Sequence, residues 1–174
     1  MNFLQRIFGS AEESPEEKKK ETEARQFDAL KYDGIAALKI GQVDYAVTCF
    51  SHALQLRDDL EIHDHLSVAY IHQNQMANAV NELRLLADAQ PDNQAVWVRM
   101  ARVCYMMEDY DQMAEACERA EAVGAGSAEV SYLYAEARQG QGDKEAAVAL
   151  LGEAIARDEH HGAAYLLRGQ ILME

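Results

Sequence analysis

Residues 41–54 read GQVDYAVTCFSHAL, and this stretch carries the pattern that decides the fold. In a helix, spacings of four and three place Ala46, Phe50 and Ala53 on one stripe. Two of these three side chains are small, which predicts that a neighbouring helix packs very close to the stripe. An ordinary core helix would carry such a stripe once, whereas a repeat protein would carry it again at a fixed interval.

The stripe returns three times further along the chain. The position of Ala46 recurs at steps of 33, 34 and 34 residues, and the positions of Phe50 and Ala53 recur with it. The three columns of equivalents are Ala79, Met113 and Ala147; Leu83, Cys117 and Leu151; and Leu86, Ala120 and Ala154. Three columns in register predict an array of helical hairpins, in which each hairpin buries its apolar face against the next.

A period of about 34 residues with two helices resembles the tetratricopeptide repeat (TPR). Other matches to that family's pattern are Leu30, Gly34 and Gly41 in the first repeat, Leu66, Tyr70 and Pro91 in the second, Trp97, Met100, Ala101 and Tyr110 in the third, and Ala135 and Gly142 in the fourth. The sequence departs from the pattern at Asp33, Asp58, Met113, Ala125 and Glu159. The resemblance covers roughly residues 27–174 and implies an all-α, right-handed α-α superhelix, a TPR solenoid of about four helical hairpins plus an extra C-terminal helix.

The repeat boundaries and the N-terminal residues divide the sequence further. We expect repeats over 27–59, 60–93, 94–127 and 128–161, and a half repeat over 162–174. Residues 14–26 are charged nearly all round and predict a helical leader that begins near Pro15, because Ser14 can cap it and Glu17 stands at the capping-box position. Residues 1–13 are expected to form a flexible apolar N-terminal hook, with Phe3, Leu4, Ile7 and Phe8 on one helical face.

Composition and charge bound the class of protein. Only two prolines and ten glycines interrupt the 174 residues, which favours long helices over a many-stranded sheet. Thirty acidic residues against sixteen basic ones give a net charge of -14, which argues against nucleic-acid binding. Cys49, Cys104 and Cys117 lack a CxxC spacing and are expected to be buried, reduced thiols. Because the sequence shows neither a signal peptide nor a stretch of membrane-spanning length, we expect a cytoplasmic protein, and a short hook with one basic residue argues against membrane contact.

The TPR resemblance also implies a binding surface, since the first helix of each repeat lines the concave groove of such arrays. The groove positions carried over as peptide-binding residues are Lys31, Tyr32, Ile35, Lys39, His65, Val68, His72, Arg99, Arg102 and Tyr105. Arg99 and Arg102 lie three residues apart on one helical face, where two guanidinium forks could hold a carboxylate, and Tyr105 adds flat contact area. This predicts a peptide with an acidic group or a free C-terminus. The alternative is that the arginines pair within the chain, with carboxylates such as Asp64 or Glu136.

No catalytic, metal or cofactor site is expected. The six histidines accompany no HExxH, no GxSxG, no phosphate-binding glycine loop and no Cys/His metal spacing. The function expected is therefore a protein-protein interaction scaffold that binds a peptide segment of a partner protein in the concave groove without chemistry. Two alternatives stay open: a self-assembling structural subunit, a homo-oligomer paired through the N-terminal hook or the C-terminal helix, and a secretion or export chaperone for one dedicated partner.

Overall fold

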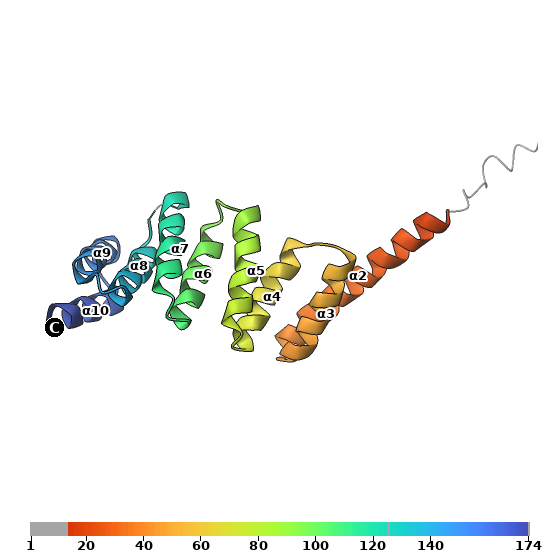
Figure 1. The fold of residues 1–174 in the computed structure, drawn as a ribbon, viewed down its shortest axis with the longest axis horizontal. Helices are drawn as coiled ribbons and strands as arrows, with labels where there is room; N and C mark the ends of the chain where they lie inside the picture. The colour runs from red at the N-terminus through yellow and green to blue at the C-terminus, as the bar shows by residue number, and fades with distance from the viewer. Residues whose placement is uncertain (1–13, 125, 174) are drawn as a thin grey trace, which may run out of the picture. The chain divides into compact units, whose positions relative to one another are not determined.

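The structure, a computed structural model, describes residues 14–124 and 126–173, and over these residues the chain is helical, with short turns and no strand (Figure 1). The predicted all-α class is confirmed. The predicted N-terminal hook lies outside the described residues. The helices are α2 (Pro15–Lys39), α3 (Val43–Leu56), α4 (Leu60–His72), α5 (Met76–Ala89), α6 (Gln94–Met106), α7 (Tyr110–Val123), α8 (Ala128–Gly140), α9 (Lys144–Arg157) and α10 (Gly162–Met173).

The chain divides into two compact units, one ending at Asp59 and the other beginning at Leu60. The N-terminal unit contains the hairpin of α2 and α3, and the C-terminal unit contains α4 to α10. None of the described helices is both long and apolar enough to cross a membrane.

In the N-terminal unit, α2 begins at Pro15, as the capping signal predicts. The Ser14 hydroxyl accepts a hydrogen bond from the Glu17 backbone N–H at 3.2 Å, and the Ser14 backbone N–H donates to a Glu17 carboxylate oxygen at 2.7 Å. The helix then runs without a break to Lys39, so the charged leader and the first helix of the first repeat form one element. Residues 14–26 are all exposed, and the first buried side chain of α2 is Phe27.

The packing of Gly34 on Phe50 explains the small residues of the opening stripe. Ala46, Phe50 and Ala53 of α3 are fully buried. A Cβ atom at Gly34 of α2 would lie only 2.6 Å from Cε1 of Phe50, so the helices approach closely enough that only glycine fits at this position. The predicted close approach of a neighbouring helix to this stripe is confirmed at Phe50.

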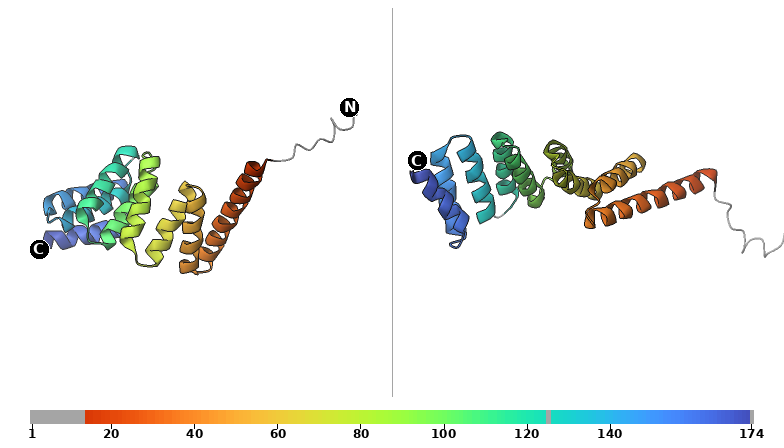
Figure 2. Two further views of the ribbon diagram at one scale, coloured as in Figure 1. Left: turned by 45° about the vertical axis from the view of Figure 1, so that its right-hand side comes forward. Right: turned by 90° about the horizontal axis from the view of Figure 1, so that it is seen from below.

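In the C-terminal unit, α4–α5, α6–α7 and α8–α9 are helical hairpins (Figure 2). Each hairpin stacks on the next, through α5 with α6 and α7 with α8, and α10 packs against α9. All three predicted columns of stripe residues are buried here: Ala79, Leu83, Leu86, Met113, Cys117, Ala120, Ala147, Leu151 and Ala154. The helical repeat predicted from the 34-residue period is thus realised as stacked hairpins with a shared core.

The turn within each hairpin repeats as closely as the core does. One residue per turn has a positive φ, and these residues stand at steps of 33, 34 and 34 along the chain. They are Gly41 (φ 78°), Asn74 (58°), Glu108 (56°) and Gly142 (84°). Glycine adopts this conformation without strain and asparagine tolerates it, but at Glu108 the left-handed backbone costs free energy.

The three cysteines are free thiols in the structure, and all three are buried, which confirms their predicted burial. Burial raises the pKa of the Cys104 thiol to about 11 and that of the Cys117 thiol to about 12. These groups therefore pack as small apolar side chains and are poor nucleophiles in the folded protein.

Candidate functional site

One face of α6 lies between two cavities in the C-terminal unit. The larger, of about 470 Å³, is lined by Gln94, Ala95, Val98, Arg99, Arg102, Ser127 and Glu129. The smaller, of about 330 Å³, is lined by Leu60, Glu61, Asp64, Leu86, Gln90, Asn93, Ala95, Val96 and Arg99. Ala95 and Arg99 belong to both, so the two hollows adjoin across α6. We call Ala95, Val98, Arg99, Arg102 and Tyr105 the α6 face.

The two arginines of the α6 face each bind a carboxylate of this chain. The Arg99 guanidinium pairs with Asp64 of α4 and also donates to the Ser67 hydroxyl at 3.3 Å. Arg102 pairs with Glu129 at the start of α8. In the structure these arginines therefore pair within the chain, which was the alternative to binding a partner's carboxylate. A carboxylate of a partner would have to displace Asp64 or Glu129. Because both pairs are partly open to water, each contributes about 0–1 kcal/mol.

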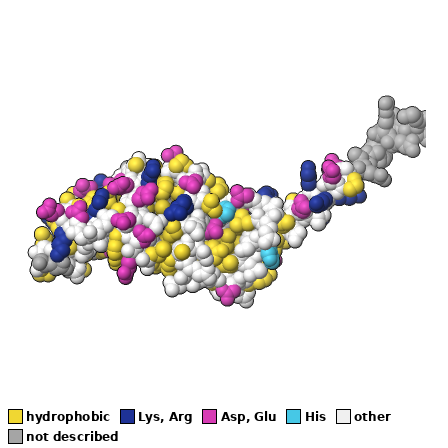
Figure 3. All heavy atoms as spheres, viewed as in Figure 1, with side chains coloured by type: hydrophobic (Ala, Val, Ile, Leu, Met, Phe, Trp, Pro, Cys, Tyr) yellow, Lys and Arg dark blue, Asp and Glu magenta, His cyan; other side chains and the backbone are white. Residues whose placement is uncertain are grey.

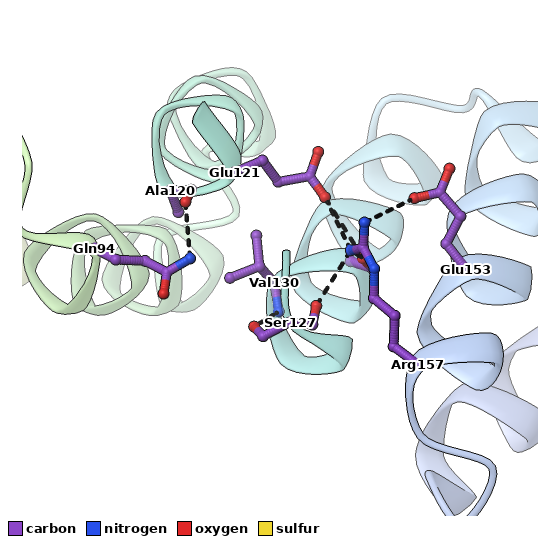
Figure 4. Close-up of polar contacts among 8 residues, drawn as sticks. Gln94, Ala120, Glu121, Ser127, Val130, Glu153 and Arg157 are labelled. Carbon is purple, nitrogen blue, oxygen red and sulfur yellow. Dashed lines mark hydrogen bonds and ion pairs between the residues drawn. The ribbon is translucent and has the colours of Figure 1, made fainter. Parts of the chain in front are cut away.

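A polar cluster holds the loop that forms one end of the larger cavity (Figure 4). Arg157, at the end of α9, donates to the Ser131 hydroxyl, to a Glu121 carboxylate oxygen at 3.4 Å and to the Ser127 carbonyl at 3.5 Å. The side chain of Gln94 donates to the Ala120 carbonyl at 2.8 Å. This cluster fixes the start of α8, and with it the wall that carries Glu129.

Two glycines of the same loop leave room for these side chains. A Cβ atom at Gly124 would lie 1.9 Å from the Gln94 amide nitrogen, and one at Gly126 would lie 2.6 Å from the Arg157 guanidinium. This cluster was not predicted from the sequence. Its only signal was the pair of glycines in VGAGS, and nothing in the sequence linked them to residues 94 and 157.

The other predicted site residues of the C-terminal unit lie on α4 and at the end of α6. His65 is partly buried, with Nε2 3.8 Å from a Glu61 carboxylate oxygen, and Val68 is half-buried. His72 is exposed at the end of α4. Tyr105 is 46% exposed and lines a third cavity, next to α8. These residues belong to the first helices of their hairpins, α4 and α6.

The remaining predicted site residues belong to the N-terminal unit. Lys31 is largely buried, with its ammonium 3.2 Å from Asp59 and 6.0 Å from the centre of the Phe27 ring. Lys31 therefore ties α2 to the segment after α3. Tyr32 is 68% exposed, Ile35 is partly buried and Lys39 is exposed.

The C-terminal unit also contains a close contact between a histidine and a carboxylate. His63, one of the six histidines that match no catalytic or metal motif, faces Glu82 across the α4–α5 hairpin, with 2.5 Å between Nδ1 and a carboxylate oxygen. Within residues 14–124 and 126–173, no group of three or more His, Cys, Asp or Glu side chains is arranged to hold a metal ion.

The cavities beside α6 are lined by both acidic and basic side chains. The carboxylates of Glu61, Asp64, Glu129 and Glu136 accompany the two arginines of α6. On the face drawn in Figure 3, Asp and Glu side chains are spread over the C-terminal unit with Lys and Arg between them. The surface therefore offers carboxylates as well as guanidinium groups to a partner.

Comparison with known proteins identifies the architecture. No protein-family model and no curated protein matches the sequence. A crystal structure of MamA protein superposes with a TM-score of 0.78 at 15% identity, over 86% of this chain and 82% of that one. MamA from Desulfovibrio magneticus RS-1, residues 41 to the end, gives 0.76 at 15% identity, over 85% and 84%.

A third solved structure, YrrB, is described as a TPR protein with an unusual peptide-binding site. It superposes with a TM-score of 0.71 at 14% identity, over 78% of this chain and 71% of that one. At such low identity these likenesses establish the fold alone. Together with the 34-residue period and the stacked hairpins, they show that the chain has the fold of tetratricopeptide-repeat proteins.

Proposed function

We propose that this protein is a non-enzymatic interaction scaffold that binds a peptide segment of a partner protein along α4, α6 and α8 of the C-terminal unit. The observation that carries the proposal is the pair of adjoining cavities on either side of the α6 face. An extended peptide needs a preformed hollow with alternating apolar and polar contacts, and Val98 supplies the apolar surface between the charged groups.

The fold neighbours support this proposal by analogy only. YrrB is described as carrying a peptide-binding site, and it shares the architecture but little sequence. The mixed charge of the wall adds an expectation of its own. Because Arg99 and Arg102 already hold carboxylates, a purely acidic peptide gains little here, and a peptide that offers both charges or a basic group fits better.

The test is selection of short random peptides on the immobilised wild-type protein, followed by affinity measurement on two variants. Ala95→Trp places a large side chain at the exposed position shared by both cavities. Ala149→Trp makes the same change at an exposed position of α9 that lines none of the cavities at this wall. We expect Ala95→Trp to weaken the selected peptides at least about tenfold, which is about 1.4 kcal/mol, and Ala149→Trp to leave the affinity unchanged.

Circular dichroism of both variants controls for folding. Failure to select any peptide, or an equal loss of affinity in both tryptophan variants, would contradict the proposed groove. Peptides that bind equally well to all three proteins would place recognition elsewhere on the chain.

A further inference from the structure

The C-terminal end of α6 contributes to a cavity in which two tyrosines stand beside a carboxylate. The cavity measures about 330 Å³ and is lined by Tyr105 of α6, Tyr110 of α7, Glu136, Gln139 and Gly140 of α8, and Leu167 of α10. Four helices thus meet around one small hollow, which nothing in the function proposed above assigns to a particular ligand group.

The walls of this cavity are held in place by their neighbours. A Cβ atom at Gly140 would lie 2.3 Å from the Tyr110 ring, so the ring packs directly on the end of α8. The side chain of Gln141 donates to Asp111 at 2.7 Å, which joins the end of α8 to the start of α7. The side of the cavity formed by Tyr110 and the end of α8 is therefore preformed and needs no ordering when a ligand binds.

The carboxylate in the cavity lacks a counter-ion of its own. Glu136 accepts a hydrogen bond from the Tyr132 hydroxyl at 3.0 Å. Among the described residues no Lys, Arg or His forms an ion pair with Glu136. Arg102 of α6 attracts the Glu136 carboxylate but forms its ion pair with Glu129. Burial raises the pKa of Glu136, and this outweighs the hydrogen bond from Tyr132 and the attraction of Arg102, both of which lower it.

The negative charge of Glu136 also affects the pKa values of the neighbouring tyrosines. The negative charge of Glu136 is the main cause of the raised pKa of Tyr105. Burial, and after it the charge of Glu136, raises the pKa of Tyr132 to about 12. A partly desolvated negative charge beside aromatic faces favours a cation: the ring faces attract it through their quadrupoles, and the carboxylate accepts a charge-assisted hydrogen bond.

We propose that the cavity formed by Tyr105, Tyr110, Glu136 and Gln139 binds a lysine or arginine side chain of the partner's peptide segment. This rests on the function proposed above and names the chemistry that the groove selects. The net charge of -14 also attracts a basic partner over distance. An acidic side chain in the same place would be repelled by the Glu136 carboxylate, and the cation that attracts Glu136, Arg102, already pairs with Glu129.

The proposal is tested by NMR titration of the full chain with N-acetyl-lysine methylamide and with its norleucine analogue. Norleucine keeps the alkyl chain and lacks the ammonium group. We expect the lysine amide to shift the ring resonances of Tyr105 and Tyr110 and the side-chain amide of Gln139, and the norleucine amide to bind at least about tenfold more weakly, since it forms neither the cation–π contact nor the ion pair.

Three variants assign the effect. Glu136→Gln keeps the shape and removes the charge, and Tyr105→Leu removes an exposed aromatic face; each should weaken lysine binding at least about tenfold. Glu145→Gln removes one charge from the exposed start of α9 and should leave the binding unchanged. Equal binding of the lysine and norleucine amides, or unaltered lysine binding in Glu136→Gln, would overturn the proposal.

The outcome is separable from that of the peptide selection. Selected peptides that need Ala95 but no basic residue would leave the scaffold function standing and overturn the cation site. Lysine binding that depends on Glu136, in a protein that selects no peptide, would support the cavity and remove the groove.

Discussion

At the scale of single residues, Glu136 is a group whose charged form the fold disfavours. Its pKa is raised above the ordinary value of 4.5, so the stability it contributes is present below pH 4.5 and is lost as the pH rises through its folded pKa. We therefore expect Glu136→Gln to increase the free energy of unfolding at pH 7 and to leave it unchanged near pH 4. Urea unfolding of both proteins at the two pH values measures this difference.

The groups around Glu136 define the controls for that measurement. Tyr132 on α8 and Tyr105 and Arg102 on α6 face it, and the Cys117 thiol on α7 lies within reach of its charge. All of them are retained in Glu136→Gln. The pKa values of Tyr105, Tyr132 and Cys117 are raised above ordinary values that are already alkaline, so these groups stay neutral between pH 4 and pH 7 in both proteins. A gain of the same size in Glu145→Gln would assign the effect to net charge and contradict the role given to burial.

The types of residue on the first helices could be predicted from the sequence, but the residues they pair with could not. Arg99, Arg102 and Tyr105 were chosen by their repeat position, and each of them lines a cavity. That they bind a peptide stays a prediction. Their pairing could not be predicted, because Asp64 is 35 residues from Arg99 and Glu129 is 27 residues from Arg102. Contacts between successive repeats depend on side-chain rotamers and on the offset between helices, and neither can be read from a single sequence. The cavity around Glu136 was missed for the same reason, since four helices form it.

At the scale of elements, signals local in sequence were the reliable ones. Ser14, Pro15 and Glu17 predicted the start of α2, because a capping box involves only neighbouring residues. The boundary expected between the leader and the first repeat has no local signal of this kind. The structure shows none either, since α2 is one helix of 25 residues that continues past residue 26. Gly41 and Gly142 were matched as repeat positions, but the left-handed backbone at Asn74 and Glu108 required the structure.

The turn between α6 and α7 holds a residue other than glycine in a left-handed conformation. Glu108 has a φ of 56°, whereas the equivalent residues of two other hairpins are glycines. We expect Glu108→Gly to increase the free energy of unfolding by about 1 kcal/mol, because the left-handed conformation costs an ordinary L-residue about 1–2 kcal/mol and glycine nothing comparable. Thermal or urea unfolding checks it.

The matched change is Gly142→Ala in the α8–α9 turn, which has a φ of 84° and open space around the glycine. There the added methyl group meets no neighbour, so only the backbone conformation opposes it. We expect a loss of similar size, about 1 kcal/mol. A Glu108→Gly variant that is less stable than wild type would show that the Glu108 side chain contributes more than the strain it imposes.

At the scale of the whole molecule, the two compact units predict two separately measurable stabilities. Gly34→Ala drives a methyl group into the buried Phe50 ring of the N-terminal unit, and Ala79→Leu overpacks a fully buried position of the C-terminal unit. Each should cost about 1–3 kcal/mol, and only in its own unit. Hydrogen exchange in increasing urea, read by mass spectrometry, should show Gly34→Ala destabilising residues 27–56 while α6 to α9 keep the wild-type midpoint, and Ala79→Leu doing the reverse. If either change shifts every helix equally, the chain unfolds as one cooperative body and the division at Asp59 has no energetic meaning.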